Sequence, residues 1–221
     1  MALQNITLIS DPKVLSIPIK ETNEPLVDLL KEKSKIRCDN SQKNLTSVTP
    51  DFSKARREVF KKLLHAQDSL PESIYLFIKE AFRPIEYQKK IFNHYKNKLR
   101  KQFSYLDEEK LYIEASKFIA PPDIIPPHST GGAVDLILVN ENNLPLEMGG
   151  FQDNNSSYNE TCLTYSENIS KKAKDNRKIL ITVMENAGFV NYPYEWWHFS
   201  FGDRYWAYLS KEPFAIYGSV K

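Results

Sequence analysis

An apolar run at residues 133–139, AVDLILV, contains a single charged side chain, Asp135. A short continuous apolar run of this kind is typical of a strand buried inside a sheet. Removing an unpaired carboxylate from water costs several kcal/mol, so a buried aspartate has a cation, a metal ion or several hydrogen-bond donors beside it. The chain must therefore fold so that a partner for Asp135 reaches the interior of its sheet.

The composition bounds the class of protein. With 41% hydrophobic and 26% charged residues in 221, the chain is apolar enough to fold. It has no apolar run of membrane-spanning length, so we expect no membrane partner. We predict one domain over residues 1–221, in which the poorly periodic residues 1–48 form an N-terminal arm packed on the core. Nothing in the sequence indicates the oligomeric state.

The charges are balanced, with 30 basic and 28 acidic side chains. The densest basic stretch, residues 96–101, lies on a predicted helix and is read as a solvated face, so we expect no nucleic-acid partner. Two cysteines make neither a disulfide framework nor a four-cysteine zinc site. Residues 1–20 lack a basic segment followed by an apolar core. We therefore predict a cytoplasmic protein; a periplasmic location, or export by an unrecognised route, is the alternative.

Apolar residues recur at helical spacing in several stretches. Thr49 and Pro50 suit the start of a helix, and Gly188 suits the end of one. The pattern predicts helices over residues 49–69, 85–100, from Asp107 onward and over 166–187.

Stretches rich in β-branched and aromatic residues alternate with these helices. They predict strands over residues 73–82, 133–139, 195–201 and 204–209, with a return strand at 144–148. Helices grouped early, followed by strands, one long helix and strands again, indicate an α+β protein. We expect a central antiparallel sheet flanked by helices.

Two histidines lie at positions suited to the partner of Asp135. His128 stands where a proline-rich loop enters the strand of Asp135, and His198 lies in the aromatic strand EWWHFSF. Two imidazoles and one carboxylate are the ligand set of a catalytic zinc that keeps one position open. The alternative interpretation has Asp135 hydrogen-bonded to loop amides, His128 in a turn and EWWH in an aromatic core.

Glu195 precedes His198 by three residues. Residues three apart on a regular strand point to opposite faces, so both side chains reach one site only if the chain bends or bulges near Glu195. A carboxylate placed there can take a proton from a metal-activated water and return it to a leaving amine. A second charged group, Arg83, is delivered by the end of the strand at residues 73–82.

Two separate stretches, HSTGGAVD at 128–135 and EWWHFSFGD at 195–203, resemble the signature motifs of the zinc D-alanyl-D-alanine dipeptidases. That family includes the vancomycin-resistance dipeptidase and shares its fold with Hedgehog-type proteins. AFRP at 81–84 and LEMGG at 146–150 are similar to further family segments. The resemblance covers roughly residues 70–210, and it implies a single zinc metallopeptidase domain that hydrolyses D-alanyl-D-alanine or a closely related dipeptide.

The resemblance also implies a role for each site residue. One Zn²⁺ per chain would be bound by His128, Asp135 and His198, and Glu195 would be the general base and acid. Arg83 would stabilise the oxyanion, a role that suits a permanently charged guanidinium; pairing with Glu80 or another acid is the structural alternative. Asp153 and Trp197 would contact the dipeptide substrate.

Two departures from the family pattern concern the substrate pocket. Pro126 stands where members commonly have serine, and MGGFQD at 148–153 replaces their MGTxFD element. The dipeptide and its stereochemistry are therefore less fixed than hydrolysis itself. Two alternatives stay open: a D,D-carboxypeptidase or L,D-endopeptidase acting on muropeptides, and a catalytically silent zinc-binding interaction module.

Overall fold

The computed structural model describes residues 6–39, 49–150 and 160–220. The strands within these residues are β1 (Leu26–Asp28), β2 (Arg37–Cys38), β3 (Lys54–Arg56), β4 (Ile74–Glu80), β5 (Ala133–Asn140), β6 (Val190–Tyr192) and β7 (Glu195–Ser200). The α-helices are α1 (Pro12–Leu15), α2 (Arg57–Asp68), α3 (Ile85–Gln102), α4 (Glu108–Ser116), α5 (Lys171–Asn186) and α6 (Arg204–Leu209). Two short 3₁₀ helices are η3 (Pro127–Thr130) and η4 (Glu160–Cys162).

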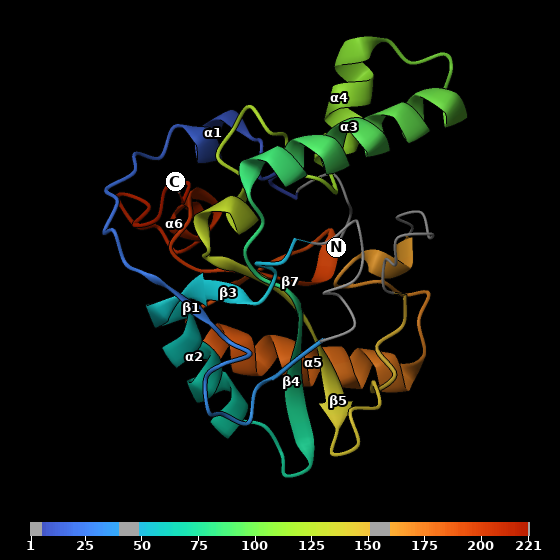
Figure 1. Cartoon of the computed structure of the whole chain (residues 1–221). Helices are drawn as coiled ribbons and strands as arrows, with labels where there is room; N and C mark the ends of the chain where they lie inside the picture. Colours follow the sequence, from blue (N-terminus) through green and yellow to red (C-terminus); the bar gives the residue numbers. More distant parts are fainter. Residues whose placement is uncertain (1–5, 40–48, 151–159, 221) are drawn as a thin grey trace.

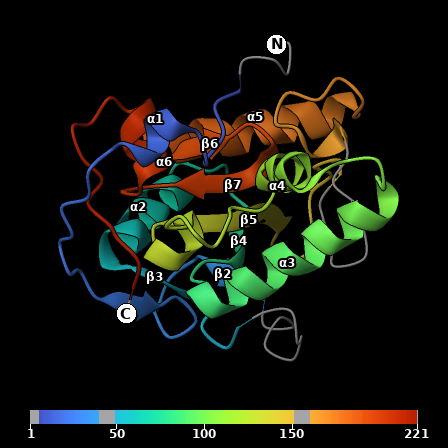
Figure 2. The same ribbon diagram turned by 90° about the horizontal axis from the view of Figure 1, so that it is seen from above.

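The central sheet has five strands in the order β2-β4-β5-β7-β6. Neighbouring strands from β4 to β6 are antiparallel, whereas the edge strand β2 pairs with β4 in parallel. The predicted α+β class with a central, largely antiparallel sheet is confirmed. Figure 2 shows β5 in the middle of the sheet, between β4 and β7. This position explains its apolar run, because Val134, Leu136 and Val139 are all fully buried.

Helices α2 and α5 pack against each other, and α5 also packs against β5 (Figure 1). Leu63 of α2, Leu180 of α5 and Leu76 of β4 are fully buried members of the same hydrophobic core. Each buried leucine contributes about 1.5–3 kcal/mol relative to an exposed one. This core packs α2 and α5 against the central sheet.

The described part of the N-terminal arm pairs with the main body. β1 and β3 form a second, two-stranded sheet in which Val27 lies opposite Ala55. β3 occupies residues predicted to be helical, so the prediction that a helix begins at Thr49 and Pro50 is wrong; α2 begins at Arg57. Helical periodicity could not reveal this strand, because its partner lies in the arm.

Two segments far from η3 in the sequence, one at the end of β3 and one near the C-terminus, hold this 3₁₀ helix by hydrogen bonds. Arg56, at the end of β3, donates from Nε to the carbonyl of Thr130 at 2.8 Å and from Nη1 to the carbonyl of Glu24 at 2.5 Å. Near the C-terminus, the N–H of Val220 donates to the carbonyl of Ser129 at 2.9 Å. Segments far apart in the sequence thus fix the turn that precedes β5.

The strands predicted over residues 73–82, 133–139 and 195–201 correspond to β4, β5 and β7. The predicted return strand at 144–148 is wrong, because that segment makes only an isolated bridge between Val139 and Pro145. Proline has no N–H with which to continue a ladder.

The predicted strand over residues 204–209 is also wrong, because these residues form the helix α6. Gly202, with φ of +77°, turns the chain away from β7. Asp203 then caps the helix by accepting the N–H of Trp206 at 2.8 Å. The turn and the cap outweigh the strand preference of an aromatic-rich segment.

The remaining helix predictions are close to the structure. α3 and α4 match the helices predicted over 85–100 and from Asp107 onward. The helix predicted over 166–187 begins late, at Lys171, because Ser170 caps it by accepting the N–H of Ala173 at 3.0 Å.

Helices α3 and α4 project together from the end of the sheet where β4 finishes (Figure 1). They share a small core of their own, which includes Phe92, Leu99 and Leu111. Among the described residues, no helix has the length and apolar content needed to cross a membrane.

Candidate metal centre and active site

Four elements bring ionisable side chains together at the end of the sheet where β4 ends and β5 begins. Asp135 on β5 lies opposite His198 on β7 and opposite Glu80 on β4. His128 lies on η3, which precedes β5. Gly131, with φ of +71°, ends η3 in a left-handed conformation that glycine adopts without strain. The chain therefore turns back sharply enough for His128 to face Asp135.

The separations within this cluster fit a bound metal ion. Oδ1 of Asp135 lies 2.9 Å from Nδ1 of His198 and 3.3 Å from Nε2 of His128. One ligand atom from each residue lies within 4.8 Å of the other two. Ligands about 2.1 Å from a tetrahedral zinc are about 3.4 Å from one another. The three side chains predicted from the sequence thus form a candidate His-Asp-His metal site.

Neighbouring groups select which nitrogen of each imidazole faces the site. Nδ1 of His128 lies 2.6 Å from the carbonyl of Ala81; a carbonyl only accepts, so this nitrogen donates and Nε2 is left for a metal. For His198 the arrangement is reversed, with Nδ1 facing Asp135 and Nε2 lying 3.4 Å from the hydroxyl of Ser200. Such partners fix the tautomer and orientation of metal-binding histidines.

The cluster is buried, and its members shift one another's protonation. Burial alone would raise the pKa of Asp135, but His128 and His198 hold it well below its ordinary value. Burial would lower the pKa of His128, but Asp135 more than offsets this and the pKa is raised. Burial lowers the pKa of His198, and its hydrogen bond to Asp135 only partly compensates. One ionised carboxylate between two imidazoles favours a cation.

Glu195 lies beside this cluster but is not one of its three candidate ligand residues. Its Oε2 is 3.9 Å from Nδ1 of His198, and the residue is 7% exposed. The register between β6 and β7 shifts at Asn191 and Tyr192, opposite this part of β7. The irregularity that the sequence required near Glu195 is therefore present, and it brings the two side chains to one site.

Arg83 is fixed by two side chains near the end of β4. Its Nε donates to Oε1 of Glu80 at 2.8 Å, its Nη2 pairs with Oε2 of Glu80, and its Nη1 donates to Oε1 of Gln88 at 2.8 Å. The structural alternative for Arg83, pairing with Glu80, is thus observed. Its charge also acts on the candidate metal site, where it opposes the net rise in the pKa of His128. The guanidinium is both held in place and electrostatically coupled to the cluster.

Two further residues, Asp153 and Trp197, are predicted from the sequence to contact the dipeptide. Trp197 is only 3% exposed, belongs to the main hydrophobic core and packs edge-on against Trp196 with ring centroids 5.5 Å apart. Asp153 lies outside the described residues. The predicted substrate contacts of both residues stay predictions.

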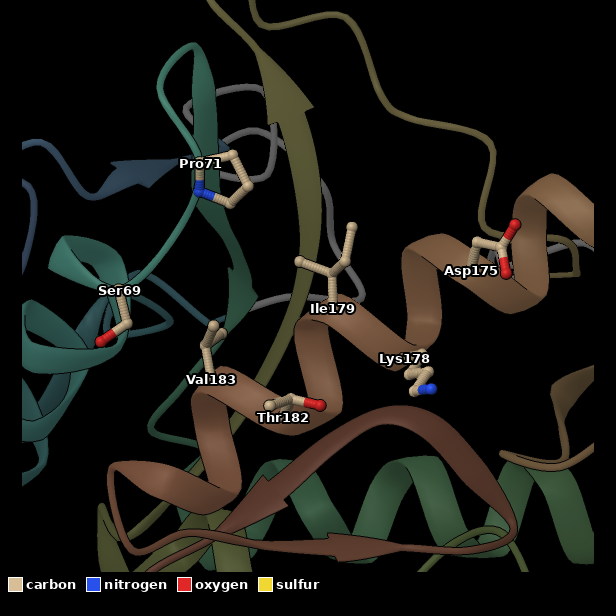
Figure 3. Close-up of a pocket in the computed structure, with 7 residues that line it drawn as sticks. All are labelled: Ser69, Pro71, Asp175, Lys178, Ile179, Thr182 and Val183. Carbon is tan, nitrogen blue, oxygen red and sulfur yellow. The ribbon is translucent and has the colours of Figure 1, made fainter.

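A surface hollow elsewhere on the molecule is separate from this cluster. Figure 3 shows it beside α5, near the end of α2. Its lining residues are Ser69, Pro71, Asp175, Lys178, Ile179, Thr182 and Val183. It shares no residue with the candidate metal site, and we assign it none of the chemistry.

Two residues that support the site were missed from the sequence. Gln88 binds Arg83 and also donates to the carbonyl of Ala120 at 2.7 Å, with only 1% of its surface exposed. Its signal is a glutamine near the start of a predicted helix, within reach of the preceding arginine. Ser200 lies two residues after His198 on the same strand, where side chains share a face.

Comparisons with known proteins identify relatives of this chain. Residues 38–215 match the family described as D-ala-D-ala dipeptidase, Peptidase_M15. A D-alanyl-D-alanine dipeptidase of Synechocystis sp. is 31% identical over 94% of this chain and 96% of its own length. A D-alanyl-D-alanine dipeptidase of Escherichia coli is 38% identical over 33% of this chain and 36% of its own. A solved vancomycin-resistance D,D-pentapeptidase, VanY, in complex with Zn(II), has a TM-score of 0.46 at 12% identity, over 92% of this chain and 96% of its own.

The fold, the His-Asp-His cluster with its neighbouring glutamate, and these sequence matches define a metallopeptidase. The chain belongs to the D-Ala-D-Ala dipeptidase family, because the family match covers most of it and the Synechocystis relative is similar along nearly its full length.

Proposed function

We propose that this chain is a zinc-dependent dipeptidase that hydrolyses D-alanyl-D-alanine, or a closely related dipeptide, to free amino acids. The observation that carries this proposal is the convergence of His128, Asp135 and His198, with Glu195 next to them but outside the ligand set. Family membership supplies the substrate class. Such an enzyme removes a cell-wall precursor or salvages D-alanine.

The proposed ligands of one Zn²⁺ per chain are Nε2 of His128, a carboxylate oxygen of Asp135 and Nδ1 of His198. Nitrogen and oxygen ligands in this number are those of catalytic zinc sites, which keep a position open for chemistry. Zinc, when bound, polarises a substrate carbonyl and lowers the pKa of water to about 7. The Ala81 carbonyl and the Ser200 hydroxyl hold the two imidazoles in the required orientation.

Glu195 is the proposed proton carrier. Its carboxylate accepts a proton from the attacking water and delivers it to the amide nitrogen as the peptide bond breaks. Burial beside the imidazole of His198 suits this task, because few solvent molecules compete for the proton. A zinc site with a purely structural role needs no uncoordinated carboxylate beside it. The presence of Glu195 next to His198 therefore argues against a catalytically silent zinc module.

Arg83 is proposed to stabilise the negative charge that develops on the substrate carbonyl oxygen. Its bonds to Glu80 and Gln88 hold the guanidinium plane before substrate arrives, so little reorganisation is needed in the transition state. The paired Glu80 also reduces the net positive charge beside the two histidines. Arg83 therefore acts through a few directed hydrogen bonds rather than as an isolated charge.

A dipeptide carries a charge at each end, and a closed pocket must pair both, because a buried unpaired charge is costly. Asp153 and Trp197 are proposed to contact the dipeptide, the first as partner of its ammonium group. A D,D-carboxypeptidase or L,D-endopeptidase acting on muropeptides would instead leave one end of the pocket open. The cytoplasmic location predicted from the sequence stays a prediction.

A direct assay tests this function. The zinc-loaded protein is incubated with D-Ala-D-Ala, L-Ala-L-Ala and D-Ala-D-lactate, with a chelator-treated sample as control, and released amino acids are measured. We expect hydrolysis of D-Ala-D-Ala alone, lost with chelator and restored by zinc. Cleavage of peptidoglycan fragments in preference to free dipeptides would favour the muropeptide enzymes, and a zinc-loaded but inactive protein would favour the silent module.

A further inference from the structure

The pairing of β7 with β6 is irregular, whereas on its other side β7 pairs with β5, where His198 lies opposite Asp135. Val190 pairs with Ser200 and Asn191 with Phe199, but the next residue, Tyr192, pairs with Glu195. Residues 196–198 therefore face no residue of β6. Backbone carbonyls in such a bulge need hydrogen bonds from elsewhere, since this whole stretch of β7 is buried.

The side chain of Asn191 supplies those hydrogen bonds. Its Nδ2 lies 3.0 Å from the carbonyl oxygen of His198, 3.3 Å from that of Trp196 and 3.4 Å from that of Glu195. An amide nitrogen has two N–H groups, so the shortest contact, to His198, is the principal one. The same residue is 7% exposed, and water therefore cannot easily replace it.

Thr164 fixes the direction of this amide. Its hydroxyl donates to Oδ1 of Asn191 at 2.6 Å, and its backbone N–H donates to the carbonyl of Pro193 at 2.9 Å. With Oδ1 held by a donor, Nδ2 must point toward the carbonyls of β7. The amide is thus clamped between the loop before α5 and the bulge.

We propose that Asn191 is a positioning residue that sets the shape of the β7 bulge and so brings Glu195 and His198 to one site. On a regular strand these two side chains would point to opposite faces. Here Oε2 of Glu195 lies 3.9 Å from Nδ1 of His198. Asn191 contacts the backbone at both ends of the segment that separates them. The proposal rests on the proposed function, in which His198 binds zinc and Glu195 moves protons.

The test compares zinc affinity and kinetics in Asn191→Leu, which keeps a similar size but removes the donors. Zn²⁺ affinity is measured by competition with a chromophoric chelator, and kcat and KM are measured with D-Ala-D-Ala. We expect zinc to bind on the order of 10- to 100-fold more weakly. At saturating zinc, kcat should still be reduced at least tenfold with little change in KM, because Glu195 is misplaced.

Gln67→Leu is the matched control. Gln67 is also a buried amide that serves the backbone, donating to the carbonyl of Ile74 at 3.0 Å and accepting the N–H of Leu76 at 2.8 Å, but near the start of β4, away from the metal site. This variant should lower Tm and leave zinc affinity and kcat within twofold. If both leucine variants had the same effect on zinc binding, the loss would be general and the positioning role would be refuted.

Two gentler variants decide the matter if Asn191→Leu fails to fold. Asn191→Asp keeps the shape but presents oxygens to the three carbonyls, and Thr164→Val removes only the hydroxyl that orients the amide. Each should weaken zinc binding several-fold in a folded protein; wild-type zinc affinity and kcat in both would overturn the proposal. Zinc affinity needs no turnover, so the result stands even if the wild type proves unable to hydrolyse the dipeptide.

Discussion

Replacing Glu195 by glutamine separates proton transfer from metal binding. The change keeps the size of the side chain and removes its negative charge and its ability to accept a proton. Because Oε2 lies 3.9 Å from Nδ1 of His198 and outside the ligand set, no metal-ligand bond is lost. Glu195→Gln should therefore keep its zinc and lose its turnover.

The expected magnitudes differ for the two properties. General acid-base groups contribute about 10²- to 10⁴-fold in rate, which corresponds to roughly 3–5 kcal/mol of activation free energy. A unit charge about 4 Å from another is worth about 1–4 kcal/mol between water and a partly polar interior. Structural zinc in zinc-finger peptides is held by about 10–16 kcal/mol. A loss of about 1–4 kcal/mol from a comparable affinity still leaves at least about 6 kcal/mol, so Glu195→Gln should remain loaded at roughly millimolar zinc.

The assay measures zinc content by elemental analysis and initial rates with D-Ala-D-Ala on the same samples. We expect one zinc per chain in both proteins and a kcat reduced at least 100-fold in the variant, with KM little changed. A variant that retains more than a tenth of wild-type kcat would refute the role of Glu195. A variant that loses its zinc would show that Glu195 belongs to the ligand set.

Three further changes test other parts of the structure. Asp135→Asn should lose most of its zinc affinity, and chelator should then no longer lower Tm, as thermal unfolding with and without chelator will show. Arg83→Lys keeps the charge but not the fork held by Glu80, so kcat should fall on the order of 100-fold with zinc content unchanged. Asp28 accepts hydrogen bonds from Ser53 at 2.7 Å and from the N–H of Leu30 at 3.2 Å, which outweigh partial burial and lower its pKa. Its ionised form therefore stabilises the fold above its ordinary pKa of 3.8, and this stability is lost as pH falls through the lowered value. Asp28→Asn should cost on the order of 1 kcal/mol in denaturant unfolding at pH 7, with the difference shrinking below pH 4.

Local signals in the sequence were enough for much of the fold. The apolar run around Asp135 predicted β5, and the capping residue Asp107 predicted the start of α4. Two of the failures have different causes. β3 exists because Ala55 pairs with Val27 of the arm, and residues 204–209 are helical because Asp203 caps them after a left-handed glycine. Distant pairing and a single backbone turn outweigh composition within a short window.

For the site, residue types predicted the metal cluster, since a buried aspartate requires a partner and two histidines lay near strand ends. The family motifs named the same residues. The residues that hold the site side chains in place were not predictable. Gln88 fixes Arg83, and Asn191 donates to backbone carbonyls of the β7 bulge. The sequence required this bulge but did not reveal the hydrogen bonds that support it. These contacts join segments that are separate in the sequence or depend on the path of the bulge.

The sequence alone determined which side chains can bind a metal ion and move a proton, because those abilities belong to imidazole and carboxylate groups wherever they occur. Only the tertiary structure decided which nitrogen of each histidine faces the site, that Glu195 stays outside the ligand set, and that Arg83 is paired with Glu80. The physical reason is distance: coordination and hydrogen bonding act over about 2–3 Å. Placement of that precision depends on how β4, η3, β5 and β7 pack together.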